Sequence, residues 1–215
     1  MSERASGFWL VAAASLLWFA WWLMPGVGIT DAQKILDGVA QQRALVSASV
    51  ILQLLSAACY APALIGLVAR PSAGSDRQMC MAAIFLLIGA MGSAADAIFH
   101  LLAYAMTAPG LDPSSFVGLM QIMQGQGLRF ILPLSAAFFV GSVWLSVVLA
   151  RRHLVSLWNP ALHGLALGVA IAGGLLSSDV GVADRTVGLA VVALVVGSQV
   201  WAGAALVGIR SRELP

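Results

Sequence analysis

Charged residues are scarce in this chain of 215 residues, since only 9% are Asp, Glu, Lys or Arg. An ordinary soluble domain has about 25%. A soluble globule of this size could not cover its surface with so few charges, and 60% of the residues are apolar. This composition excludes a soluble enzyme, a disordered chain and a nucleic-acid-binding module, and it predicts a polytopic membrane protein.

Cysteine and histidine are also rare, with two Cys (Cys59 and Cys80) and three His. Two thiols can form at most one bridge, which excludes a disulfide framework. The net charge is only +2, and no block of like charge occurs. A net charge this small does not indicate a nucleic-acid partner.

Long apolar runs are what the sequence has in abundance. A membrane-spanning helix needs about 20 mostly apolar residues. Six candidate runs occur, at about 7–24, 43–68, 78–106, 129–150, 161–176 and 186–209, of which the fifth is short and rich in Gly. We therefore expect one all-α domain over residues 1–215, a bundle of six transmembrane helices embedded in a lipid bilayer. The first run lacks a following A-x-A-like site, so a retained helix is favoured over a cleaved signal.

The basic residues indicate an orientation. Seven lie in the N-terminus, the second and fourth loops and the C-terminus, and four lie in the other loops (Lys34, Arg43, Arg129 and Arg185). Because cytoplasmic loops carry the excess of Lys and Arg, we expect both termini in the cytoplasm of a bacterial-type inner membrane. Arg129 would then extend to the outer headgroups or bind an anionic group from outside.

Two of the outer loops contain helix-start signals. Thr30-x-x-Gln33 is a capping-box pattern, and Asp112-Pro113 is typical of an N-cap followed by Pro at the first helical position. Both loops predict short amphipathic helices on the outer side. These helices would be either surface connectors or a lid over a cavity that opens outward.

Asp96 and His100 are the ionisable residues that lie clearly inside a span, where such groups are costly and mark functional sites. They share one helix face because they are four residues apart. Polar residues extend that face and form a second stripe on the preceding span: Ser93, Tyr104 and Thr107 on the third, and Ser49, Gln53, Ser56 and Tyr60 on the second. At roughly 1.5 Å of rise per residue, Gln53 and Asp96 lie at one depth, so the two stripes can face each other.

The leading hypothesis is a polar intramembrane site that opens outward and binds a small molecule, an ion or a proton, in a sensor- or transport-type protein. Its expected lining is Gln53, Ser93, Asp96, His100, Tyr104 and Gln199. Because imidazole changes its charge in the physiological pH range, such a site could respond to pH.

Three alternatives remain open. Asp-x-x-x-His is a spacing that suits a metal, so Asp96 and His100 could hold one, or His100 could bind a single haem b in a redox enzyme. Asp96 could also orient His100 as a general base toward Ser93 or a water. Alternatively, the stripes only join helices in a structural subunit of a larger complex. Small residues such as Gly89, Gly92 and Gly164-x-x-x-Gly168 permit close helix packing in a bundle or a homo-oligomer.

The stretch Ala150-Arg-Arg-His-Leu-Val-Ser-Leu-Trp-Asn-Pro-Ala-Leu resembles the connection between the fourth and fifth spans of uncharacterised six-span bacterial membrane proteins. Those proteins share a basic pair, a short hydrophobic stretch, Trp and Pro at this place. The resemblance implies a six-span fold and carries no activity.

Overall fold

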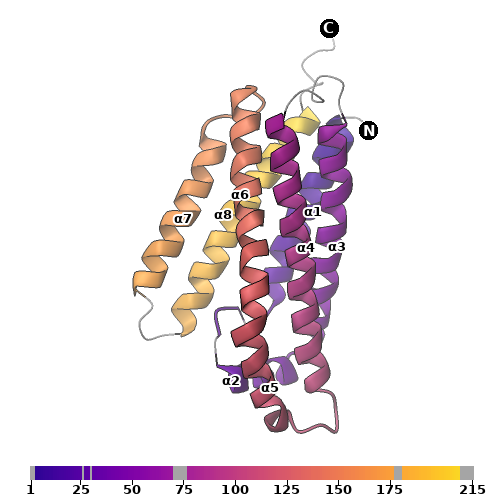
Figure 1. The fold of residues 1–215 in the computed structure, drawn as a ribbon, viewed down its shortest axis with the longest axis vertical. Helices are drawn as coiled ribbons and strands as arrows, with labels where there is room; N and C mark the ends of the chain where they lie inside the picture. Colours follow the sequence, from indigo (N-terminus) through magenta and orange to yellow (C-terminus); the bar gives the residue numbers. More distant parts are fainter. Residues whose placement is uncertain (1–2, 26, 30, 70–76, 177–180, 209–215) are drawn as a thin grey trace.

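All regular secondary structure in the described residues is helical, as expected for an all-α protein (Figure 1). The structure is a computed structural model that describes residues 3–25, 27–29, 31–69, 77–176 and 181–208. Its elements are α1 (Glu3–Leu23), α2 (Ala32–Gln41), α3 (Arg43–Val68), α4 (Arg77–Met106), η1 (Pro113–Phe116), α5 (Val117–Ile122), η2 (Met123–Gly127), α6 (Leu128–Arg151), α7 (Trp158–Leu176) and α8 (Gly181–Gly208). The five residues of η2 form a π-helical turn.

Five of the described helices are long and apolar enough to cross a membrane, namely α1, α3, α4, α6 and α8. The expected runs agree closely with them, and α3 begins and ends where predicted. Helix α7 is not among the five. Large apolar side chains such as Met91 (64% exposed) and Phe130 (77% exposed) project from the bundle, as lipid-facing residues do. The chain is thus a multi-pass membrane protein.

Contacts between the helices define the direction of each one. Ser49 and Ser56 of α3 contact Ala20 and Ala13 of α1, so α1 and α3 are antiparallel. Contacts of the same kind show that α4 is antiparallel to both α3 and α6. They also show that α8 is antiparallel to both α1 and α7. Helices α3, α6 and α8 therefore run one way, and α1, α4 and α7 run the other way (Figure 1).

Glycines bring α4 and α6 into backbone contact. A Cβ on Gly89 would lie 2.3 Å from the Cα of Phe138, and one on Gly92 would lie 2.5 Å from the Cβ of Leu134. On the other helix, a Cβ on Gly141 would lie 2.5 Å from the backbone nitrogen of Leu86. Only a residue without a side chain allows this separation, which confirms the expected role of Gly89 and Gly92 in close packing.

Short helices cover one end of the bundle, which we call the α2/α5 end (Figure 1). Helix α2 begins one residue later than a Thr30 cap would require, because Asp31 is the N-cap and its carboxylate accepts from the backbone N–H of Lys34 at 2.9 Å. The predicted capping box is therefore wrong in register; Thr30 itself lies outside the described residues. Gln33 instead donates to Asp37 at 2.8 Å.

The second helix start at this end is confirmed. Asp112 is the N-cap of η1 and Pro113 is its first residue, although the turn is a 3-10 helix rather than an α-helix. Further along, Met120 is fully buried, and Phe116 and Met123 pack against the same cluster as α2. These apolar side chains therefore hold the two short segments against each other and against α3 and α4.

Acidification is expected to release the Asp112 cap. The hydroxyl of Ser114 (2.6 Å) and its backbone N–H (3.0 Å) donate to the carboxylate and lower the pKa of Asp112. Because the folded pKa lies below the unfolded one, this stabilisation is present above the ordinary aspartate pKa and is lost as pH falls through the lowered value. The carbon-13 carboxyl resonance should titrate below the ordinary range, and Ser114→Ala should raise its midpoint. A midpoint unmoved by Ser114→Ala would contradict this assignment.

Candidate functional site

The polar stripe of α3 lies entirely inside the bundle, because Ser49, Gln53, Ser56 and Tyr60 are all buried. The hydroxyls of Ser49 and Ser56 each donate at 2.7 Å to a backbone carbonyl of α1, those of Ala20 and Ala13. These two serines thus join helices, as one of the alternatives anticipated. Of the other two residues, Gln53 contacts α4 and Tyr60 contacts α8.

Gln53 and Asp96 meet at one depth, as their positions in the sequence predict. The Gln53 Nε2 donates to Asp96 Oδ2 at 2.8 Å. His100 Nδ1 lies 3.5 Å from the same oxygen and 2.9 Å from the backbone carbonyl oxygen of Asp96. Since a carbonyl can only accept, the contact with the Asp96 carbonyl oxygen requires a proton on Nδ1. The side chains of His100 and Asp96 keep 18% and 20% exposure, respectively.

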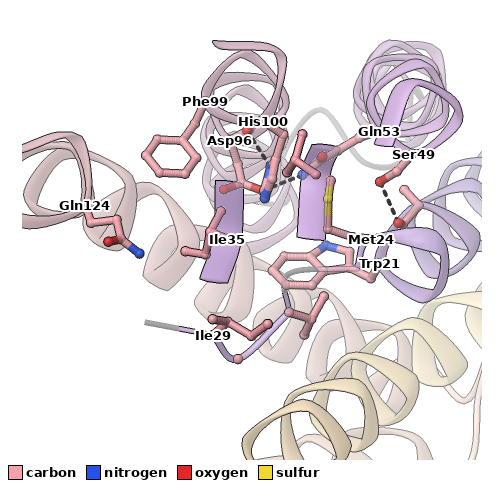
Figure 2. A pocket seen from close by; sticks show the side chains of 14 residues that line it. Trp21, Met24, Ile29, Ile35, Ser49, Gln53, Asp96, Phe99, His100 and Gln124 are labelled. Carbon is pink, nitrogen blue, oxygen red and sulfur yellow. Dashed lines mark hydrogen bonds and ion pairs between the residues drawn. The ribbon is translucent and has the colours of Figure 1, made fainter. Parts of the chain in front are cut away.

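Those partly exposed groups line a cavity of about 220 Å³ at the α2/α5 end, which we call the end cavity (Figure 2). Its walls come from α1, the following loop, α2, α3, α4 and η2: Ala20, Trp21, Met24, Val27, Gly28, Ile29, Ile35, Val39, Ser49, Gln53, Asp96, Phe99, His100 and Gln124. Figure 2 shows Asp96 and His100 facing Trp21, Met24 and Ile35 across this space. The carboxylate is therefore surrounded mainly by apolar and aromatic side chains.

A second space of about 380 Å³, the central cavity, lies deeper in the bundle and shares Trp21, Gln53 and Asp96 with the first. Its other walls come from α1, α4, α6 and α8: Leu17, Gly89, Gly92, Ser93, Ile131, Leu132, Ser135, Phe138, Phe139, Val191, Val192, Val195 and Val196. Ser93 thus belongs to the central cavity. The Gln53–Asp96 pair forms part of the boundary between the two spaces.

Tyr104 lines neither cavity. Its ring lies beneath Arg43, whose guanidinium carbon is 3.8 Å from the ring centroid. Arg43 also donates to the Tyr104 carbonyl oxygen at 2.8 Å and to the Thr107 hydroxyl at 2.7 Å. In the sequence Arg43 is a basic residue counted with a loop, whereas in the structure it links the start of α3 to the end of α4.

Gln199 lies in a different polar group and lines neither cavity. It accepts from the Tyr60 hydroxyl and donates to Ser142 at 2.6 Å. The neighbouring Ser198 donates to Asn159 Oδ1 at 3.1 Å, and Asn159 Nδ2 donates to the Ser198 carbonyl at 2.8 Å. Helix α8 walls the central cavity through valines and not through Gln199.

The residues around His100 offer few ligands for a metal. Within the described part of the chain, no group of three or more His, Cys, Asp and Glu is close enough to hold an ion. His153 is exposed with a left-handed φ of 57°, and His163 is buried in α7 beside Phe139. The end cavity is also below the range of about 300–1,000 Å³ that is usual for ligand pockets, so the donors and the space do not fit a haem.

A Ser–His catalytic pair does not form here. The Ser93 hydroxyl is buried and makes no hydrogen bond, while His100 Nδ1 is directed to Asp96. The two side chains line different cavities. Because the two side chains are not in contact, His100 cannot accept a proton directly from Ser93 as a general base.

Several wall residues were missed by sequence reasoning. Trp21, Met24, Phe99 and Gln124 line the end cavity but are not among the residues expected from the sequence. No sequence signal marked Trp21, because the contact between its neighbour Ala20 and Ser49 is a tertiary one. No protein-family model, no curated protein and no solved structure matches this chain. Its function therefore has to be inferred from the site itself.

Proposed function

We propose that the end cavity binds a small cation, such as a protonated amine, in a sensor- or transport-type membrane protein. The observation that supports this is the partly exposed Asp96 carboxylate, whose Oδ2 accepts from Gln53. The rings of Trp21 and Phe99 stand beside it in the same cavity. A carboxylate supplies the opposing charge, and aromatic faces attract cations.

The size of the end cavity favours a small ligand. A volume of about 220 Å³ holds about seven water-sized groups at about 30 Å³ each. Ile35 and Val39 of α2 and Gln124 of η2 form the wall at the end of the bundle. A ligand entering from that side would pass the two short segments, in the role of the lid anticipated from the sequence.

The access side follows from an inferred topology of six spans. Helices α6 and α8 run in the same direction, so the chain has to return between them, and α7 runs the opposite way (Figure 1). We infer that α7 completes six crossings and that both termini are on one side. The excess of basic residues on that side favours the cytoplasm, and with this orientation the end cavity would open at the outer face of a bacterial-type inner membrane.

Binding of alkylammonium ions tests the proposal. Methylammonium to butylammonium would be titrated calorimetrically into the protein in lipid nanodiscs, with the corresponding alcohols as neutral controls. Asp96→Asn keeps the shape of the side chain and an acceptor for Gln53 but removes the charge. We expect its affinity for the ammonium ions to fall about tenfold, because a hydrogen bond to a charged group contributes roughly 1.5 kcal/mol.

Asp112→Asn is the matched control, because Asp112 is an exposed carboxylate that caps η1 at the same end. Its removal should leave ammonium affinity unchanged. Wild-type protein that binds the alcohols as well as the ammonium ions, or Asp96→Asn protein that binds both ions and alcohols like the wild type, would refute a cation site.

A further inference from the structure

The central cavity differs from the end cavity in its chemistry. Most of its wall is apolar, with four valines of α8 facing Phe138 and Phe139 of α6. Its lining residues on α6 lie roughly 5–17 Å along the helix from its first residue, at about 1.5 Å per residue. Most of this space therefore lies at the level of the lipid acyl chains, and its walls are suited to a hydrocarbon.

The central cavity has an open side between α6 and α8. Helix α8 packs chiefly against α1 and α7, whereas α6 packs chiefly against α4. Figure 1 shows α6 and α8 diverging toward the α2/α5 end. Two of the lining residues on α6 are exposed, Ser135 and Leu132, the latter by 60%. Because these helices are surrounded by lipid, a molecule can enter this cavity sideways from the membrane.

One polar atom inside the cavity has no partner. Ser93 Oγ is buried and makes no hydrogen bond, unlike Ser49 and Ser56, whose hydroxyls reach backbone carbonyls of α1. A buried polar group without a partner costs free energy. Gln53, Asp96 and Ser135 are the other polar residues of the wall, and a water beside them would leave the larger, apolar part of the cavity unfilled. A ligand with one hydrogen-bonding group would satisfy this hydroxyl.

We propose that the central cavity binds a lipid-soluble molecule made of a hydrocarbon chain that ends in one small neutral polar group, a hydroxyl or a carbonyl. The chain enters between α6 and α8 and lies among the valines and phenylalanines. The polar group reaches Ser93, near the Gln53–Asp96 boundary. This site goes beyond the cation site and takes its ligand from the lipid rather than from water.

Photolabelling with a diazirine-bearing decan-1-ol tests this site in nanodiscs. We expect the label on peptides of α6 and α8 that contain residues 131–139 and 191–196, and we expect decan-1-ol to compete better than decane. Ser135→Phe should block the mouth and abolish the labelling. Val140→Phe is the matched control, since Val140 lies on the same helix, is 44% exposed and does not line the cavity.

Ser93→Ala should weaken competition by decan-1-ol about fivefold and leave that by decane unchanged, because one hydrogen bond is lost. Labelling that is spread evenly over lipid-facing helices, or that survives Ser135→Phe, would overturn the proposal. Equal competition by decane and decan-1-ol would overturn the role of Ser93. Alkylammonium binding should persist in Ser135→Phe because Ser135 does not line the end cavity, so failure of one site is distinguishable from failure of the other.

Discussion

Gly89→Ala is expected to lower the free energy of unfolding by about 3 kcal/mol. The added Cβ would meet the Cα and the backbone nitrogen of Phe138 at 2.3 and 2.5 Å. A backbone cannot rotate away as a flexible side chain can, so α4 and α6 would have to separate. Both helices also line the central cavity, and the labelling pattern there should change with the separation.

Gly197→Ala is the matched control, because nothing lies within 4 Å of a Cβ built on this residue in α8. Alanine is the better helix former by about 1 kcal/mol, so this variant should be as stable as the wild type or slightly more stable. Unfolding by sodium dodecyl sulfate, followed by circular dichroism or intrinsic fluorescence, measures both variants. Equal stabilities of the two would show that α4 and α6 do not pack through Gly89.

Arg43→Met is expected to lower the free energy of unfolding by about 2 kcal/mol. Methionine keeps much of the aliphatic length but removes the donors to the Tyr104 carbonyl and the Thr107 hydroxyl and the cation over the Tyr104 ring. Since these contacts join the start of α3 to the end of α4, hydrogen exchange should increase in the last turn of α4. Arg43→Lys should restore only part of the stability, because an ammonium lacks the planar fork of guanidinium.

Arg129→Met is the control for this prediction. Arg129 is exposed near the start of α6, and substitution of an exposed residue usually changes stability by no more than about 0.5 kcal/mol. The same unfolding and exchange measurements apply to both arginines. If the two variants lost the same free energy of unfolding, the contacts of Arg43 with α4 would not contribute measurably to stability.

Much of the helical pattern could be predicted from single residues. The ends of α3 coincide with Arg43 and the run up to Val68, because a charge and a polar loop are costly within the hydrocarbon. The rise per residue of a helix also predicted that Gln53 and Asp96 lie at one depth, which their 2.8 Å hydrogen bond confirms. The register of α2 was missed because Thr30 and Asp31 are adjacent and both are good caps.

The contacts of Tyr104 and Gln199 could not be predicted from their positions in the sequence. Tyr104 continues the helix face of His100, yet its ring contacts Arg43 from α3. Gln199 is on a helix that walls the central cavity, yet it turns to Tyr60 and Ser142. Periodicity specifies which face of one helix a residue occupies, but rotation and tilt of the neighbouring helices decide which side chains that face meets.

The sequence by itself determined the membrane environment, the helical fold and the single carboxylate placed well inside a span, because the cost of burying charge in hydrocarbon acts on each residue separately. Only the tertiary structure decided that Asp96 borders two cavities, that Trp21 belongs to both and that Ser93 lacks a partner. Cavities depend on how far helices such as α6 and α8 diverge. That divergence results from packing among α1, α4 and α7 together, which no local pattern encodes.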